Sequence, residues 1–150
     1  MLTDLQVISR LLLSVLLGGV IGLERQIQQR TAGLRTHILV SLGSCLIMLT
    51  SIYVFDIYKT QVPLDPGRIA AGVITGIGFL GAGAIMRETN EIKGLTTAAS
   101  LWVVAGMGLA VGCGFYIAAI FAAILAVIAL FFLRYIKVSL FGKAKGDDSL

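Results

Sequence analysis

Charged residues are scarce in this sequence. Asp, Glu, Lys and Arg make up 13% of the 150 residues, which is about half of the ~25% found in an average soluble domain. Hydrophobic residues make up 57%. So few charges cannot cover the surface of a small water-soluble domain, and disorder requires a polar, highly charged composition. The composition therefore predicts an integral membrane protein and excludes both other classes.

Residues that bind metals or act as nucleophiles are equally few. The chain has one histidine, His37, and two cysteines, Cys45 and Cys113, without a spacing typical of metal ligands. His37 has no acidic neighbour in the sequence that would suggest a catalytic triad. We therefore expect free, buried thiols, a hydrogen-bonded His37 and no enzymatic activity. No cofactor is predicted, with Mg²⁺ as the one weak candidate.

Three long stretches contain no Asp, Glu, Lys or Arg. Residues 38–55 and 69–86 form stretches of 18 residues each, and residues 94–133 form one of 40. A helix needs about 20 mostly apolar residues to cross a bilayer, so the third stretch holds two crossings, with a break at the glycines of residues 112–114. A weaker N-terminal stretch contains Arg10.

The sequence thus predicts an all-α, polytopic membrane protein. We expect a compact bundle of five transmembrane helices at about residues 4–23, 37–55, 69–86, 95–111 and 115–134. Residues 1–135 would form a single transmembrane domain, and residues 136–150 would form a short cytoplasmic tail, too short for a soluble domain.

The charges between these helices predict the orientation. With five spans, nine of the twelve Lys and Arg residues fall on one side of the membrane, and Arg10, Lys59 and Arg68 fall on the other. Positively charged loops stay in the cytoplasm, so we expect the N-terminus outside and the C-terminus in the cytoplasm. The cations are not interleaved with aromatic residues, so topology explains the net charge of +4 better than nucleic-acid binding does.

Small residues recur every four positions in two of the predicted helices. The first helix has Ser14, Gly18 and Gly22, and the fourth has Gly108 and Gly112. Such stripes let helices approach closely in lipid. We therefore expect a bundle in which small and weakly polar residues face inward.

A weak internal repeat accompanies these stripes. Four residues recur 61 positions later: Gly22, Gly33, Leu34 and Thr36 are matched by Gly83, Gly94, Leu95 and Thr97. Each half then consists of a glycine-rich span, a charged turn, a Gly-Leu-x-Thr block and another span. Two such hairpins would form a parallel repeat about an axis normal to the membrane, with the fifth helix added.

The third predicted span is rich in glycine, at positions 72, 76, 78, 81 and 83. Gly76 to Gly81 match the pattern G-x-G-x-x-G, but they lie inside an apolar run, and Glu91 follows by only ten residues. A dinucleotide site needs a strand, a turn and a helix with a more distant acidic residue, so this function is excluded. Two interpretations remain, close helix packing or a locally unwound helix facing a cavity. They concern Gly72, Gly76, Gly78, Gly81 and Gly83.

Charged and hydroxyl residues gather at the predicted cytoplasmic edge, where spans 1 and 3 end and spans 2 and 4 begin. They are Glu24, Arg25, Arg35, Thr36, Arg87, Glu88, Thr96 and Thr97. Charges at one depth near hydrocarbon should pair, and Glu24 or Glu88 with an arginine is the expected pair. The set forms either an ion-paired rim or a pocket for an anion, a cation or a partner's side chain.

A second charged cluster is predicted on the outer side, from Arg10, Asp65 and Arg68. Residues 65–68 have the composition of a turn that leads into span 3. Asp65 would cap that helix or pair with either arginine. Mg²⁺ keeps most of its waters and uses one or two carboxylates, which makes Asp65 a weak metal candidate.

The chain resembles the MgtC/SapB family of bacterial membrane proteins over about residues 10–135. The resemblance rests on five ordered blocks, residues 18–26, 32–36, 65–71, 76–83 and 94–102. It implies a five-span inner-membrane protein with a cytoplasmic C-terminus, a link to magnesium limitation and, in some members, to virulence. Longer members continue into a soluble C-terminal domain, which we expect to be missing here. Thr96 stands where some virulence-associated members carry Asn, so a virulence role is not carried over.

Two functions follow from these observations. The first is a regulator in adaptation to magnesium limitation or stress, which acts by binding other membrane proteins. It agrees with the resemblance and with the small-residue stripes. The second is a small transporter or channel for Mg²⁺ or an anion. Five short spans are few for a conduction path, so this function would require a homodimer or a larger oligomer.

Overall fold

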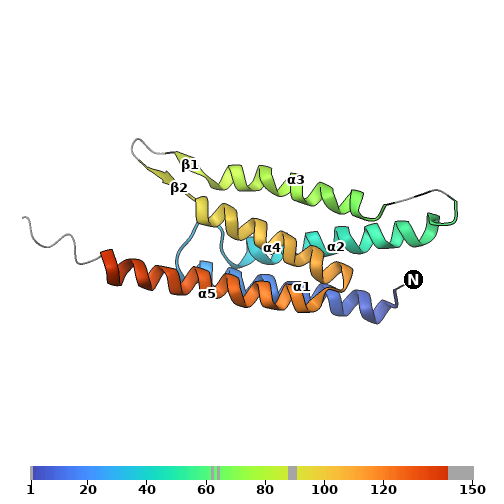
Figure 1. Cartoon of the computed structure of the whole chain (residues 1–150), viewed down its shortest axis with the longest axis horizontal. Coiled ribbons are helices and arrows are strands. Elements are labelled where there is room, and N and C mark those ends of the chain that lie inside the picture. Colours follow the sequence, from blue (N-terminus) through green and yellow to red (C-terminus); the bar gives the residue numbers. More distant parts are fainter. Residues whose placement is uncertain (1, 62, 64, 88–90, 142–150) are drawn as a thin grey trace, which may run out of the picture.

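The computed structural model describes residues 2–61, 63, 65–87 and 91–141, with side chains described as far as Phe131. In chain order the elements are α1 (Asp4–Ile27), α2 (Leu34–Tyr58), α3 (Gly67–Ala84), β1 (Met86–Arg87), β2 (Ile92–Lys93), α4 (Leu95–Cys113) and α5 (Tyr116–Phe141). The five helices run along one long axis and alternate in direction (Figure 1). The predicted all-α membrane bundle is confirmed, since α1 to α4 are each long and apolar enough to cross a membrane.

Helix boundaries differ from the predicted spans mainly at the ends. α2 begins at Leu34 and ends at Tyr58, several residues beyond the apolar run on both sides. α5 continues to Phe141, past the predicted end at residue 134. α3 instead ends early, at Ala84, because Ile85 is already extended and leads into a short antiparallel hairpin of β1 and β2. This hairpin stands where the sequence predicts only a charged turn.

Local sequence signals explain where α1 begins and where α4 ends. Thr3 and Gln6 form a capping box, in which each side chain accepts a hydrogen bond from the other's backbone N–H. Gly114 ends α4 with a φ of 89°, a left-handed conformation that favours glycine. The N–H of Phe115 then bonds back to the carbonyl of Ala110 at 2.8 Å, so the break between the last two helices lies at the predicted glycines.

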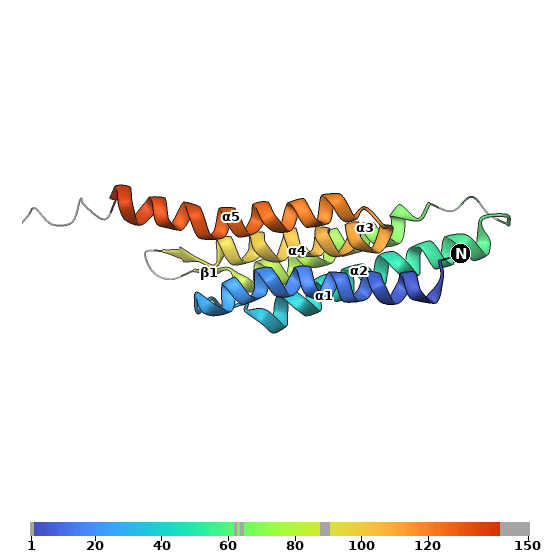
Figure 2. The same cartoon turned by 90° about the horizontal axis from the view of Figure 1, so that it is seen from below.

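α4 occupies the centre of the bundle, with α1, α2, α3 and α5 around it (Figures 1 and 2). Half of its most apolar stretch is buried inside the bundle, against 11% of the corresponding stretch of α3. α3 lies at one edge (Figure 1), where it packs on α4 and, less extensively, on α2. The structure is therefore a tight core of α1, α2 and α4, with α3 and α5 packed against its outside. We call α3 the outlying helix, because it lies at one edge of the bundle (Figure 1).

The predicted small-residue stripes form the tightest contacts of this core. A Cβ added at Gly18 of α1 would lie 2.7 Å from the Cβ of Ser41 in α2, and one at Gly112 of α4 would lie 2.7 Å from the Cβ of Met48. At Gly108 an added Cβ would overlap the carbonyl oxygen of Ser41. Ser41 is thus held between α1 and α4, and the inward-facing stripes predicted from the sequence are confirmed.

The two Gly-Leu-x-Thr blocks occupy equivalent places in the fold. Gly33 is the residue before α2 and Gly94 the residue before α4, and each helix begins at the following leucine. The threonines differ in environment, because Thr36 is exposed and Thr97 is buried. This placement is consistent with internal duplication, which stays a prediction.

Candidate functional site

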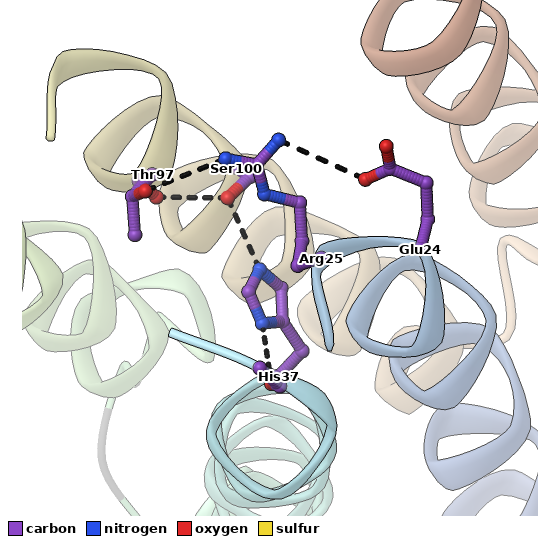
Figure 3. Close-up of polar contacts among 6 residues, drawn as sticks. Glu24, Arg25, His37, Thr97 and Ser100 are labelled. Atoms are coloured by element: carbon purple, nitrogen blue, oxygen red, sulfur yellow. Dashed lines mark hydrogen bonds and ion pairs between the residues drawn. The ribbon is translucent and has the colours of Figure 1, made fainter. Parts of the chain in front are cut away.

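A buried polar cluster lies at one end of the core, where α1 ends and α2 and α4 begin (Figure 3). We call this end of the bundle the basic end, because it also carries the arginines of both adjacent connections. Arg25 enters the cluster from the last turns of α1 and is 4% exposed. Its Nη1 lies 3.7 Å from Oε2 of Glu24, and its Nη2 donates to Oγ1 of Thr97 at 3.4 Å.

The charges in this cluster are incompletely compensated. Both carboxylate oxygens of Glu24 and the Nε of Arg25 are fully buried and have no hydrogen-bond partner among the described residues. A charge held away from water without good hydrogen bonds is costly, and ionisable residues in a membrane domain usually mark function. The pair is therefore the strongest chemical feature of the core.

His37 joins the same cluster from α2 and is completely buried. Its Nδ1 lies 2.9 Å from the carbonyl oxygen of Gly33, which can only accept, so Nδ1 donates. Its Nε2 lies 3.0 Å from Oγ of Ser100, and that hydroxyl also donates to the carbonyl oxygen of Thr97 at 2.8 Å.

The hydroxyl of Ser100 has a single proton, which it can donate either to Nε2 of His37 or to the carbonyl oxygen of Thr97. When Ser100 donates to Thr97, Nε2 must donate as well, and His37 is then a cation. When Ser100 donates to Nε2, His37 is neutral and the bond to Thr97 is given up. Protonation of His37 and the direction of this hydroxyl are therefore coupled.

Only part of the predicted cytoplasmic-edge set meets in this cluster. Glu24, Arg25 and Thr97 come together, while Arg35 and Thr36 line a groove between α2 and α3. Thr96 faces a separate cavity of about 260 Å³ between α1, α4 and α5. Arg87 lies in β1, and Glu88 falls outside the described residues.

The sequence interpretation missed one member of the cluster, Ser100, whereas the expected hydrogen-bonded His37 is confirmed by its bonds to Gly33 and Ser100. A periodic signal for both Ser100 and His37 was present. Ser100 follows Thr97 by three residues and so lies on the same helix face. His37 precedes Ser41 by four residues on the inward stripe of α2. What the sequence lacked was the rotation that turns these two faces toward each other.

The groove between α2 and α3 has a volume of about 780 Å³ and a nearly apolar lining. Arg35 and Thr36 lie at its basic end, and Gly43, Gly72 and Gly76 lie along it. An added Cβ at any of these three glycines would meet no atom within 4 Å. The groove is thus open space within the described structure and is continuous with the surface that faces lipid.

The glycines of α3 fit the predicted close packing at one position only. The helix is regular from Gly67 to Ala84, so an unwound segment is wrong. Close packing holds at Gly81 alone, where an added Cβ would lie 3.7 Å from the Cβ of Ala98. The other four, Gly72, Gly76, Gly78 and Gly83, would meet no atom within 4 Å.

At the opposite end of the bundle, Arg10 does not join Asp65 and Arg68. It is 8% exposed, and it donates from Nε to the hydroxyl of Tyr116 at 2.9 Å and from Nη1 to the carbonyl oxygen of Gly112 at 2.8 Å. Its cation is thus held at the C-terminal end of α4, where helix carbonyls favour positive charge.

Asp65 and Arg68 share a smaller cavity of about 190 Å³ at the start of α3. Oδ1 of Asp65 accepts the N–H of Gly67 at 2.7 Å, so this carboxylate caps the helix. In the described part of the chain, no three residues of His, Cys, Asp or Glu gather as a metal site.

Comparison with known proteins identifies relatives over nearly the whole chain. The model of the MgtC family matches residues 11–139. Protein MgtC of Salmonella typhimurium (strain LT2) is 48% identical over 127 residues, which cover 85% of this chain and 52% of that protein. The "Putative magnesium transporter YhiD" of Escherichia coli (strain K12) is 46% identical over 125 residues, which cover 82% of this chain and 58% of that protein.

A protein of Haemophilus influenzae without an assigned function is 40% identical over 128 residues, which cover 83% of this chain and 54% of that protein. The chain spans about half the length of the curated relatives it matches. No solved structure matches it.

Proposed function

The chain belongs to the MgtC family, and from this premise we propose that it is a regulator in bacterial adaptation to magnesium limitation or stress. In this proposal it lies in the inner membrane with its N-terminus outside and its C-terminus in the cytoplasm. It acts by binding other membrane proteins through α3, and it catalyses no reaction of its own. The basic end then faces the cytoplasm, in keeping with the distribution of Lys and Arg.

The observation that carries the proposal is the unpacked outer face of α3. Among the described residues of this helix, only Ala70, Ile77 and Gly81 are buried. A second face carries small residues at spacings of four, three and four, all of them exposed: Ala71, Thr75, Gly78 and Ala82. In lipid, association of helices depends on close backbone approach at small residues. This stripe, which we call the outer stripe of α3, has no partner among the residues that the structure describes.

The core supports this use of α3. α1, α2 and α4 are joined by glycine contacts and by the Glu24–Arg25–His37 cluster, so they form a rigid support. α3 is anchored to that support by one face and presents the others to the membrane. A helix placed in this way can bind a partner without disturbing the packing of the core.

The experiment is chemical crosslinking of the full chain in its native membrane during magnesium limitation. Gly78→Leu would fill the outer stripe, and Gly106→Leu in α4 is the matched control, because an added Cβ at either position meets no atom within 4 Å. We expect a reproducible crosslinked partner and normal growth at low magnesium for the wild type and Gly106→Leu, and loss of both for Gly78→Leu. Absence of any partner, or equal behaviour of the two variants, would contradict the proposal.

A second function, transport of Mg²⁺ or an anion by an oligomer, is supported by the buried Glu24 carboxylate. Its oxygens have no hydrogen-bond partner among the described residues, and such groups in membrane domains mark ion pathways. Flux of Mg²⁺ and of chloride would be measured in liposomes that contain the purified chain. Transport by the wild type that is lost in Glu24→Gln would favour this function over regulation, and absence of flux would remove it.

A further inference from the structure

The groove between α2 and α3 has the depth of one membrane leaflet. Its lining runs along α2 from Arg35 to Ile47 and along α3 from Leu80 back to Ile69. At ~1.5 Å per residue these segments are about 18 Å and about 16 Å long, close to half of the ~30 Å hydrocarbon core. Beyond that depth α2 and α3 are joined, because Oγ of Ser51 donates to the carbonyl oxygen of Pro66. The groove therefore opens at the basic end and closes past the middle of the membrane.

The open end of the groove is suited to an anion. Arg35 is exposed there and forms no ion pair with the described residues, and the hydroxyl of Thr36 lies beside it in sequence. Both belong to the first turn of α2. The N–H of Leu34 donates to Oε1 of Gln26 at 3.4 Å and that of His37 to the carbonyl oxygen of Gly33 at 3.2 Å, which leaves the N–H groups of Arg35 and Thr36 as backbone donors in the described structure. Guanidinium, hydroxyl and backbone N–H groups together are the donors that bind a phosphate.

The interior of the groove is suited to hydrocarbon more than to a helix. Gly43, Gly72 and Gly76 leave its walls free of side chains. A transmembrane helix would have to leave the groove where Ser51 meets Pro66, whereas acyl chains end at the middle of the membrane.

We propose that this groove binds an anionic phospholipid of the leaflet at the basic end, with its phosphate at Arg35 and Thr36 and its acyl chains along Gly43, Gly72 and Gly76. The bound lipid fills the space between α2 and α3 and holds the outlying helix against the core. The site is distinct from the outer stripe of α3, since Gly72 and Gly76 lie on another face of that helix than Gly78. It therefore stands or falls independently of the proposed function.

The test is native mass spectrometry of the full chain, delipidated in detergent and then supplied with phosphatidylglycerol, phosphatidylcholine or inorganic phosphate. For the wild type we expect one tightly bound phosphatidylglycerol, favoured over phosphatidylcholine by about tenfold, because the choline cation of phosphatidylcholine offsets the charge of its phosphate and is repelled by the Arg35 guanidinium. Arg35→Gln removes this preference. Arg30→Gln, which removes an exposed arginine of the same end outside the groove, retains it.

Two further variants test the acyl site. Gly76→Leu fills the groove and should lower binding of both lipids, while Gly106→Leu should leave it unchanged. If Gly76→Leu fails to fold, Arg35→Gln still decides, because its side chain is exposed. Thermal unfolding gives a second readout, in which phosphatidylglycerol raises the Tm of the wild type but not that of Arg35→Gln.

Several outcomes would overturn the lipid site. One is an equal lipid preference in the wild type and Arg35→Gln, and another is loss of preference in Arg30→Gln. Inorganic phosphate that displaces the lipid at millimolar concentration would point to a headgroup site without an acyl groove. A disulfide-linked dimer formed by the single variants Gly43→Cys or Gly76→Cys would assign the groove to a second copy of the chain.

Discussion

Two glycines of α4, separated by one residue, should respond in opposite ways to the same substitution. At Gly108 an added Cβ overlaps the carbonyl oxygen of Ser41 and lies 2.8 Å from the Cβ of Ser44. At Gly106 it meets no atom within 4 Å. Alanine is the smallest change that introduces this Cβ, so Gly108→Ala and Gly106→Ala form a matched pair that differs in packing alone.

The expected magnitudes follow from these distances. Overpacking of a tight interface costs about 1–3 kcal/mol, and we expect the upper end at Gly108, because backbone of α2 cannot rotate away as a side chain can. Gly106→Ala has no contact to lose and restricts the unfolded chain, which stabilises by about 0.4–1 kcal/mol. At roughly 2–4 °C per kcal/mol for a chain of this size, Gly108→Ala should lower the Tm by about 6–12 °C, and Gly106→Ala should raise it by about 1–4 °C.

The measurement is thermal unfolding of the purified chain in one detergent, followed by circular dichroism. Equal Tm values for the two glycine variants would refute the reasoning that α2 and α4 approach through Gly108. A destabilised Gly106→Ala would show that the open side of α4 is covered in solution.

Three other outcomes are expected. Arg25→Met should lower stability by about 3–5 kcal/mol because it leaves the Glu24 carboxylate buried and unpaired, and the double variant Arg25→Met/Glu24→Gln should recover most of the loss in thermal unfolding. Ser100→Ala should cost about 1–3 kcal/mol through its two lost hydrogen bonds, whereas the exposed Thr96→Ala should be nearly neutral, as chemical denaturation would show. A fluorescent protein fused after residue 150 should fluoresce in the cytoplasm; an active periplasmic reporter at the same place would reverse the orientation.

The buried cluster and the outlying helix suggest a division of roles within the fold. The cluster ties α1, α2 and α4 together where they are most charged, at the basic end. α3 contributes no residue to it and keeps two faces free, one toward the groove and one toward the membrane. If α3 binds partners as we propose, variation in its exposed faces changes that binding with little effect on the stability of the core.

The number of helices and their tightest contacts followed from the sequence because both depend on local properties. The length of an uncharged run determines whether a helix can cross hydrocarbon, and the glycines of residues 112–114 end α4 wherever it packs. Stripes such as Gly18 with Gly22 predict that another helix packs closely there, because small residues at a spacing of four share one face of a helix.

Only the tertiary structure decided which of the equivalent residues carry the site. Arg25 and Arg35 both flank an apolar run, yet Arg25 is buried against Thr97 while Arg35 lies exposed at the groove. The glycines of α3 look like those of α1 and α4 in sequence, but at four of the five predicted positions an added Cβ would meet no atom within 4 Å. Arg10 binds the end of α4 instead of Asp65. The physical reason is rotation: a periodic pattern shows which residues share a face, but the neighbour that this face meets depends on how all five helices pack at once.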